Sequence, residues 1–458
     1  MSKFPKDDCP DTPLAVIVLA AGHGTRMKSE VPKVLHEVAG CPMLRHVLDT
    51  VEMVSPTKIV VVIGPDMEEV ESICQAHIVV VQEERLGTGH AVLQARESLE
   101  GFAGNILVVF GDTPLVTPDT ILLMKQALNE EGNAALAVLG FELESPKGYG
   151  RIRCKKDGTV ESIVEELEAN KEDKQITLCN SGAMIFRAEV MFRELIKVGN
   201  QNVKGEYYLT DLISLVQDSG GNVGLVVGLP DELQGINSRI DLANAEAVMQ
   251  SRLRTRAMAA GVTLIDPRTT WLSMDTIFGR DVTVGPNVFL GKSVEVGDRV
   301  EIKAFSHLEG VKLGNDVAVG PFARLRPDTV IGSGAKVGNF VEIKASQIGK
   351  AAKVSHLSYI GDSNVGKDVN IGAGTITCNY DGVAKHLTRI GDGAFIGSNS
   401  ALVAPVSIGE NSIVGAGSVV TRDVEQDELS VTRAEQKHLK GGAKRWKGRR
   451  SKGKSKGS

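Results

Sequence analysis

A repeat of six residues in the C-terminal half limits the fold of this chain more than any other feature. From Phe278 onward, an aliphatic or aromatic residue recurs at nearly every sixth position and is often followed by glycine, as in Val284-Gly285. The repeat breaks over residues 378–389 and resumes at Ile390. A six-residue period is typical of a parallel β-helix, in which three repeats form one triangular coil and the aliphatic residues point inward. The period of an α-helix, about 3.6 residues, cannot produce it.

The N-terminal half has a different pattern, in which short apolar strands alternate with helical stretches. The strands read as buried segments over Leu14–Leu19, Ile59–Ile63, Ile78–Val81 and Ile106–Val109. This alternation predicts an α/β fold with a doubly wound, mostly parallel sheet and helices on both faces. In such sheets, ligands bind beyond the carboxyl ends of the strands.

The two halves are joined by a segment with the signals of one helix, residues 238–260. Ser238 is a candidate N-cap with Asp241 three residues later, and Gly261 is a candidate stop. The patterns together predict an α/β domain over 1–237, a linker helix over 238–262, a β-helix domain over 263–439 and a basic tail over 440–458.

Charge is distributed unevenly along the chain. The net charge is −5, but residues 440–458 hold nine Lys or Arg and no acid, so the remainder sums to −14. The composition of this tail predicts disorder. A solvated tail is the commoner case, and a nucleic-acid or envelope-binding module is the non-enzymatic alternative. Because Trp446 is the only aromatic residue there, we expect no specific nucleic-acid partner.

Several features predict a cytoplasmic protein without a membrane span. No run approaches the roughly 18 apolar residues that a spanning helix needs. The first residues, MSKFPKDDCPDT, lack the apolar core of a signal peptide. Six cysteines are scattered without a CxxC pair, which suits free thiols in a reducing compartment.

A glycine-rich turn follows the first predicted strand, in the string Ala20-Ala21-Gly22-His23-Gly24-Thr25-Arg26-Met27. Small residues there let backbone N–H groups approach a phosphate closely. The string is not a dinucleotide fingerprint, because Met27 stands at the third glycine, and GK[ST] of a P-loop is absent. With Pro32-Lys33 after it, the string resembles the nucleotidyltransferases that join a sugar 1-phosphate to a nucleoside triphosphate.

Further motifs extend this resemblance to the uridylyl members. They are Gln82 with Leu86–Ala91, Phe110-Gly111-Asp112, Gly148–Arg151, Asn180-Ser181-Gly182 and Gly235–Arg239. The resemblance implies a nucleotide and sugar site formed by Leu19, Ala20, Ala21, Gly22, Arg26, Lys33, Gln82, Gly87, Thr88, Phe110, Gly111, Asp112, Gly150, Glu165, Asn180 and Asn237. It further implies Mg²⁺ bound by Asp112 and Asn237. Phe110 and Ser181 depart from the Tyr and Thr usual in the family.

Alternatives stay open for some of these residues. Arg26 and Lys33 could instead be solvated surface charges. Asp112 could instead be the N-cap of a helix. Glu165 has Glu166 and Glu168 as neighbours, so its register is open. The implied chemistry needs no general base, because the attacking phosphate oxygen is already ionised. The barrier is electrostatic, and Mg²⁺, Arg26 and Lys33 would lower it.

The C-terminal half holds a second set of motifs where its repeat deviates. Arg324–Pro327 and Lys344 bring cations into the repeat, His356 and Tyr359 follow, and residues 378–386 form an inserted loop. The positions 326, 344, 380 and 398 differ by multiples of 18, which in an ideal coil stacks residues on one side. The strings resemble the acetyltransferase half of the bifunctional UDP-N-acetylglucosamine pyrophosphorylase and glucosamine-1-phosphate N-acetyltransferase family, with its left-handed β-helix.

This second resemblance implies an acetyl-transfer site with His356 as general base, a role for which the ordinary pKa of histidine is suited. His307 and His386 are the competing histidines. The sugar phosphate would be bound by Arg326, Lys344, Tyr359, Asn370 and Lys385. Acetyl-CoA would be bound by Ala373, Asn379, Tyr380, Ser398, Ala416 and Arg433.

The sequence thus predicts a bifunctional enzyme that acts on small molecules. Acetyl-CoA and glucosamine 1-phosphate would give N-acetylglucosamine 1-phosphate, and UTP would convert it to UDP-N-acetylglucosamine and pyrophosphate. The family builds its acetyl site between rods, which implies a homotrimer. The enzymatic alternative is another sugar-nucleotide synthase with a purely structural β-helix, which leaves His356 and the inserted loop unexplained.

Overall fold

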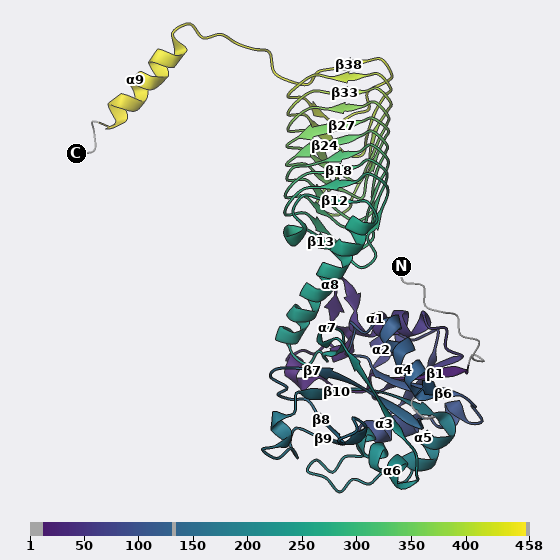
Figure 1. The fold of residues 1–458 in the computed structure, drawn as a ribbon. Helices are drawn as coiled ribbons and strands as arrows, with labels where there is room; N and C mark the ends of the chain where they lie inside the picture. The colour runs from purple at the N-terminus through teal and green to yellow at the C-terminus, as the bar shows by residue number, and fades with distance from the viewer. Residues whose placement is uncertain (1–11, 131–133, 455–458) are drawn as a thin grey trace. The chain divides into compact units, whose positions relative to one another are not determined.

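The computed structural model describes residues 12–130 and 134–454, and Figure 1 shows their secondary structure along the chain. The chain divides between Leu253 and Arg254 into two compact units. The first is an α/β unit and the second is built from short parallel strands. Within the described residues, no helix has the length and apolar character needed to cross a membrane.

The first unit is organised around a nine-stranded sheet with the order β11-β7-β10-β6-β1-β4-β5 and a hairpin, β8–β9, attached to β10. Strands β6, β1, β4 and β5 are parallel, and β10 is antiparallel to both β6 and β7. The mostly parallel sheet that the sequence predicted is confirmed. The bounds are β1 (Leu14–Leu19), β4 (Lys58–Ile63), β5 (Ile78–Val81), β6 (Asn105–Phe110), β7 (Leu136–Glu142), β8 (Arg151–Cys154), β9 (Val160–Val164), β10 (Leu178–Arg187) and β11 (Val223–Gly228), with β2 (Glu37–Val38) and β3 (Cys41–Pro42) as a separate hairpin.

Helices cover both faces of this sheet. Alternate residues of β1 belong to two different buried clusters: Val16 and Val18 pack with one set of helices, and Ala15 and Ile17 with the other. This is the period-two pattern of a strand that is buried on both sides. The first cluster includes α1 (Met43–Glu52), α2 (Glu68–Ile73) and α4 (Pro118–Glu130), and the second includes α3 (Thr88–Gln94), α5 (Ala188–Leu195) and α6 (Leu212–Asp218).

One predicted strand differs from expectation in its burial. We expected Ile78–Val81 to be a buried strand, but β5 is the outermost strand of the sheet and pairs with β4 alone. Ile78 and Val81 are 39% and 40% exposed. An apolar run of four residues shows that a segment is extended, but it does not show whether neighbours cover both of its sides.

The second unit is a triangular β-helix made of three parallel ladders. The first ladder contains β12 (Thr263–Leu264), β15 (Thr283–Val284), β18 (Glu301–Ile302), β21 (Ala318–Val319), β24 (Lys336–Asn339), β27 (Lys353–His356), β30 (Asn370–Ile371), β33 (Phe395–Ile396), β36 (Ile413–Val414) and β38 (Leu429–Ser430). The second contains β13 (Trp271–Leu272), β16 (Phe289–Leu290), β19 (His307–Leu308), β22 (Arg324–Leu325), β25 (Glu342–Lys344), β28 (Tyr359–Gly361), β31 (Ile376–Cys378), β34 (Ala401–Val403) and β37 (Val419–Val420). The third contains β14 (Ile277–Phe278), β17 (Val294–Val296), β20 (Val311–Leu313), β23 (Thr329–Ile331), β26 (Gln347–Ile348), β29 (Ser363–Val365), β32 (Thr388–Ile390) and β35 (Val406–Ile408).

The stacking of coils explains the glycine that follows the aliphatic residue in so many repeats. Val337 is 1% exposed, and the next residue, Gly338, lies against the backbone of the following coil. A Cβ on Gly338 would lie 1.9 Å from the carbonyl oxygen of Ser355. Glycine is therefore required there by the close approach of two backbones.

The break in the repeat is an insertion into one coil. Val354 pairs with Ile371, 17 residues later, whereas Ile371 pairs with Ile396, 25 residues later. The added residues form a loop closed by an antiparallel bridge between Tyr380 and Lys385. The predicted extruded loop is confirmed.

Helix α8 (Arg239–Ala259) occupies the range in which a linker helix was predicted, and its start has the predicted cap. Ser238 Oγ accepts a hydrogen bond from the Asp241 N–H at 3.2 Å, and the Asp241 carboxylate accepts one from the Ser238 N–H at 2.8 Å. The helix is not a free-standing arm, because residues up to Leu253 belong to the first unit. Met249 and Leu253 are buried.

The basic tail differs from expectation. Residues 440–458 were predicted to be disordered, but helix α9 spans Gly442–Lys454. Low sequence complexity dominated the prediction, while Lys, Arg and Ala are favourable helix formers. Residues 455–458 lie outside the described residues.

Candidate functional site

A cavity of about 270 Å³ lies at the carboxyl ends of β1 and β6. Ten residues of the predicted uridylyl site line it: Leu19, Ala20, Ala21, Gly22, Lys33, Gln82, Gly87, Thr88, Phe110 and Asp112. These residues come from four separate segments of the chain. The position is the one at which parallel α/β sheets bind their ligands.

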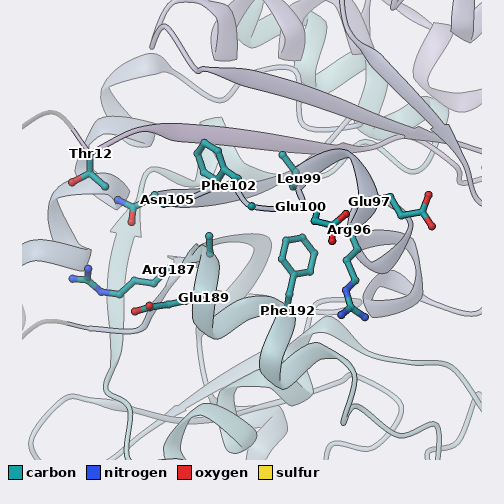
Figure 2. A pocket seen from close by; sticks show the side chains of 14 residues that line it. Thr12, Arg96, Glu97, Leu99, Glu100, Phe102, Asn105, Arg187, Glu189 and Phe192 are labelled. Atoms are coloured by element: carbon teal, nitrogen blue, oxygen red, sulfur yellow. The ribbon is translucent and has the colours of Figure 1, made fainter.

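A larger cavity of about 770 Å³ lies elsewhere in the first unit and contains none of the predicted residues. Figure 2 shows that Phe102 and Phe192 lie on different sides of it, with Arg96 near Glu97. Asn105, which begins β6, and Arg187, which ends β10, also line it. This cavity therefore lies at the amino end of β6, the opposite edge from the predicted site.

The glycine-rich turn brings Lys33 close to the end of β1. Gly24 has a φ of +64°, and a Cβ at this position would lie 2.4 Å from Cβ of Lys33. Both the backbone conformation and the space require glycine there. The turn thus lets the segment carrying Lys33 cross close to the strand end.

Four predicted residues meet in one polar cluster beside the cavity. The Lys33 ammonium pairs with Asp112 Oδ2 and lies 3.2 Å from Asn237 Oδ1. Arg26 Nη2 donates to the same Asn237 oxygen at 2.8 Å. The side chains of Lys33 and Asp112 are 13% and 15% exposed, so the pair is largely shielded from water. Residues more than two hundred positions apart in sequence are brought together here.

The oxygen atoms of this cluster fit a magnesium ion. Asp112 supplies a carboxylate and Asn237 an amide oxygen, and both contact the same ammonium of Lys33. Mg²⁺ in phosphoryl-transfer sites is bound by one or two carboxylates, with substrate phosphates and water completing the shell. In the described residues there is no group of three or more His, Cys, Asp or Glu side chains suited to a metal. Asp112 and Asn237 supply only two ligand atoms, so a bound phosphate and water would have to complete the shell of Mg²⁺.

Three further predicted residues form a second group. A Cβ on Gly150 would lie 3.6 Å from Glu165 Oε1 and 3.7 Å from Cβ of Asn180. The Asn180 N–H donates to the Gly150 carbonyl at 2.9 Å. Burial raises the pKa of the Glu165 carboxyl. The remaining predicted residue, Gly111, sits between the cavity residues Phe110 and Asp112 and donates its N–H to Leu19 O at 2.9 Å.

The cavity has four lining residues that sequence reasoning missed: Val34, Arg85, Ala91 and Glu206. Val34 adjoins the predicted Lys33, and Ala91 ends the Leu86–Ala91 motif, although it was not named as a site residue. Arg85 lies in the loop before Leu86, next to a recognised motif. Glu206 comes from a segment that carries no motif, and only the tertiary fold brings it here.

In the β-helix, His356 belongs to a vertical row of residues, the His356 column. It consists of Asn339, His356, Ala373, Ser398 and Ala416, one from each successive coil. In every coil the residue after the column member donates its N–H to the carbonyl of the member in the coil before: Leu357 to Asn339 at 3.0 Å, Gly374 to His356 at 3.3 Å, Asn399 to Ala373 at 2.8 Å and Gly417 to Ser398 at 2.8 Å.

The His356 column joins the predicted base to three predicted acetyl-CoA residues. Arg433 also reaches it, since its Nη1 donates to the Ala416 carbonyl. The His356 ring is exposed, and its Nδ1 lies 2.7 Å from Asn339 Oδ1. Because an amide oxygen can only accept, this pairing favours the tautomer of the neutral ring that has its proton on Nδ1, in which Nε2 can accept a proton.

Three of the predicted sugar-phosphate residues, Arg326, Lys344 and Tyr359, lie on or beside strands of the second ladder. Lys344 pairs in register with Gly361, and its ammonium lies 3.7 Å from Asp362 Oδ2. The nearby Lys344 ammonium lowers the pKa of Lys385. A Cβ on Gly361 would lie 2.5 Å from the Tyr359 hydroxyl and 2.8 Å from Asn379 Nδ2. Lys344, Tyr359 and Lys385 of the predicted sugar-phosphate set therefore form one group with Asn379 of the predicted acetyl-CoA set, here named the Lys344 cluster.

Arg326 stands one coil below Lys344 and pairs with Glu342 at 3.0 Å. The spacing of 18 residues thus stacks 326 on 344, as the register of β22 and β25 shows. The 18-residue spacing does not place Tyr380 and Ser398 on the same stack. Tyr380 lies in the inserted loop, and Ser398 belongs to the His356 column of the first ladder, because the insertion shifts every later position.

The competing histidines have other surroundings. His307 stacks on Phe289 with ring centroids 4.6 Å apart, and burial lowers the pKa of His307. His386 Nε2 lies 2.6 Å from Asp381 Oδ2 inside the inserted loop. The backbone N–H of Ala384, with the His386 ring, holds the pKa of Asp381 below its usual range.

The residues predicted for acetyl transfer are divided between two ladders of the rod. His356 and the acetyl-CoA residues Ala373, Ser398 and Ala416 follow strands of the first ladder, as Asn370 lies on β30 of that ladder. Arg326, Lys344 and Tyr359 lie on or beside strands of the second ladder. The two groups occupy different sides of the same triangular rod.

The fold and the two clusters define a nucleotidyltransferase unit followed by a hexapeptide-repeat transferase unit. Residues 16–175 match the family described as MobA-like NTP transferase domain, and residues 310–345 and 387–422 match bacterial transferase hexapeptide (six repeats). A relative from Paramagnetospirillum magneticum, named bifunctional protein GlmU, is 50% identical and covers 97% of this chain and 98% of its own. Relatives with the same name from Azorhizobium caulinodans and Zymomonas mobilis are 50% and 46% identical, covering 92% and 96% of this chain and 95% and 99% of their own.

The chain belongs to the GlmU family of bifunctional proteins. It is a left-handed β-helix transferase fused to a nucleotidyltransferase. The predicted function is confirmed: bifunctional synthesis of UDP-N-acetylglucosamine, with acetyl transfer to glucosamine 1-phosphate and uridylyl transfer to N-acetylglucosamine 1-phosphate.

Proposed function

We propose that the two reactions are divided between the two units and that the two clusters described above carry them. The α/β unit uses the cavity at the ends of β1 and β6 for uridylyl transfer, and the β-helix uses the His356 column and the Lys344 cluster for acetyl transfer. The observation that supports this most strongly is the convergence of Arg26, Lys33, Asp112 and Asn237 beside a cavity lined by the glycine-rich turn.

In the uridylyl step, a phosphate oxygen of N-acetylglucosamine 1-phosphate attacks the α-phosphorus of UTP, and pyrophosphate leaves. Arg26 and Lys33 offset the negative charge that the reacting phosphates bring together. Asp112 and Asn237 would hold Mg²⁺, which supplies Lewis-acid stabilisation of the phosphate oxygens. Lys33, which pairs with Asp112 beside the cavity, would bind a phosphate there.

In the acetyl step, the amine of glucosamine 1-phosphate attacks the thioester carbonyl, and the carbon–sulfur bond breaks to release the thiol of CoA. The amine must lose a proton, and His356 Nε2 accepts it. Arg326, Lys344 and Lys385 bind the phosphate of the sugar, with Tyr359 and Asn370 at the sugar ring. Ala373, Asn379, Tyr380, Ser398, Ala416 and Arg433 line the groove for acetyl-CoA.

A homotrimer would complete the acetyl site, because the base and the phosphate-binding cations lie on different sides of one rod. An apolar column supports such assembly: Phe305, Phe322, Phe340 and Leu357 are 52%, 45%, 55% and 61% exposed. The three rings stack with centroids 4.9 and 5.1 Å apart. Leu357 directly follows His356, so a rod packed on this column would reach the catalytic histidine.

A product assay tests the division of labour. The full chain is incubated with acetyl-CoA, glucosamine 1-phosphate, UTP and Mg²⁺, and the products are identified by mass spectrometry. A fragment ending at Leu253 should convert preformed N-acetylglucosamine 1-phosphate to UDP-N-acetylglucosamine, since it keeps Asn237 and the buried start of α8. A folded but inactive fragment would contradict the assignment. Because both co-substrates are intracellular metabolites, we place the protein in the cytoplasm.

A further inference from the structure

Arg85 is a cation in the candidate nucleotide cavity that the sequence motifs did not single out. It lies between β5 and α3 and lines the cavity together with Ala21 and Gln82. Its Nε donates to the Ala21 carbonyl at 2.6 Å, which fixes the guanidinium against the glycine-rich turn. Its Nη2 is buried, and no group in the described part of the chain accepts a hydrogen bond from it.

The fold keeps a space for this guanidinium. Gly64 follows β4, and a Cβ at this position would lie 2.1 Å from Arg85 Nη2 and 2.8 Å from its Cζ. Any side chain at residue 64 would therefore displace the guanidinium. A buried donor on a charged group is costly when it has no acceptor, so a ligand in the cavity is the natural source of one.

The neighbouring Gln82 offers the complementary group. Gln82 is 3% exposed, and its Nε2 donates to the Gly87 carbonyl at 3.1 Å. Within residues 12–130 and 134–454, no donor reaches its Oε1. The cavity thus has a donor on Arg85 and an acceptor on Gln82. Uracil presents a ring N–H flanked by carbonyl oxygens, which matches this pair, whereas cytosine presents an amine and an unprotonated ring nitrogen on that edge.

We propose that Arg85 donates from Nη2 to a carbonyl oxygen of the uracil ring and thereby helps the site to select UTP over CTP. The proposal rests on the proposed function of this cavity in uridylyl transfer. It adds a residue that reads the base, while Lys33 and Arg26 face the phosphates.

The test compares kcat/KM with UTP and with CTP for the full chain, Arg85→Ala and the control Arg96→Ala. Arg96 is an exposed arginine of the larger cavity in Figure 2. We expect Arg85→Ala to lower kcat/KM for UTP by about 10–100-fold, the factor of a hydrogen bond to a charged group, and to leave the value for CTP unchanged. Arg96→Ala should change neither. An equal loss with both nucleotides, or no loss with UTP, would overturn the proposal.

Nucleotide analogues identify the oxygen and exclude a purely structural role. Wild-type enzyme is assayed with 2-thio-UTP and with 4-thio-UTP, each of which replaces one carbonyl oxygen by sulfur, a weak acceptor, and keeps the ring N–H. With one of the two analogues, kcat/KM of the wild type should fall by the same factor as the Arg85→Ala substitution causes with UTP. With that analogue, the Arg85→Ala substitution should lower kcat/KM no further. Full wild-type activity with both analogues would reject the contact.

A replacement variant and the wild-type activity distinguish failure of the Arg85 proposal from failure of the proposed function. If Arg85→Ala does not fold by its melting curve, Arg85→Gln replaces it, since glutamine cannot both hold the Ala21 carbonyl and reach the base. If the wild-type chain transfers no uridylyl group from UTP, the proposed function fails. If it does, and Arg85 variants behave like Arg96→Ala, only this inference fails.

Discussion

The two units bring the residues of a site together in different ways. In the α/β unit, loops from distant parts of the chain converge at the sheet edge, so Lys33, Asp112 and Asn237 are in contact within one chain. In the β-helix, each coil lies directly on the previous one, so residues of one ladder stack and residues of two ladders stay apart. A crossover fold brings distant segments of one chain to one site, whereas a rod stacks residues in columns along its ladders.

The largest effect that bears on this comparison is expected at the base. His356→Ala should lower acetyl transfer by about 10²–10⁴-fold, because general-base loss typically costs that much. Uridylyl transfer should be unchanged, since the histidine lies in the other unit. Both rates are measured on the same preparation.

A mixing experiment sharpens this first prediction. His356→Ala chains, altered in the first-ladder half of the site, and Lys344→Ala chains, altered in the second-ladder half, are denatured together, refolded and assayed for acetyl transfer. If the site is shared between rods, mixed assemblies should recover activity that neither parent has. A monomer with full acetyltransferase activity would refute the shared site.

The second expected effect is at the metal pair. Asp112→Ala removes the carboxylate of the proposed Mg²⁺ site and should lower uridylyl transfer by about 10²–10³-fold, the cost of losing one electrostatic stabiliser of the transition state. Acetyl transfer should persist. Chelation of Mg²⁺ from the wild type should reproduce the pattern, and equal loss of both activities with an unchanged melting curve would show the assignment to be wrong.

A smaller effect is expected at Asn339, which accepts from His356 Nδ1. Asn339→Ala should lower the kcat of acetyl transfer by about 10–100-fold, as is usual for a residue that orients a catalytic ring. The KM values for both substrates should change little. Asn339→Asp keeps an acceptor and should restore much of the rate, whereas a purely structural role would give no such rescue.

The smallest expected effect concerns the apolar column. Phe340→Lys should weaken the proposed trimer, because burying a phenylalanine contributes about 1.5–3 kcal/mol. Light scattering across a dilution series should show the dissociation midpoint at least about tenfold higher, with acetyl transfer lost in parallel and uridylyl transfer retained. Lys312→Ala, on the third ladder, is the control. An unchanged midpoint would place the interface elsewhere.

Local patterns predicted the elements of both units well. The strands β1 and β4 fall where apolar runs predicted them, and Ser238 with Asp241 caps α8 as expected. The burial of β5 and the helix in the tail were predicted wrongly. Both depend on what surrounds a segment, and a run of residue types carries no information on its neighbours.

The sequence by itself determined the β-helix, the cluster of motifs at the glycine-rich turn and the family, because repeat period, glycine spacing and strand alternation are properties of short windows of chain. Only the tertiary structure decided the rest. It placed Asn237 beside Lys33 across 204 positions. It placed His356 and Lys344 on two different ladders of the rod, and among the residues that the structure describes it left the Arg85 Nη2 donor without an acceptor. Each of these is a contact, or a missing contact, between segments that only the folded chain brings near one another.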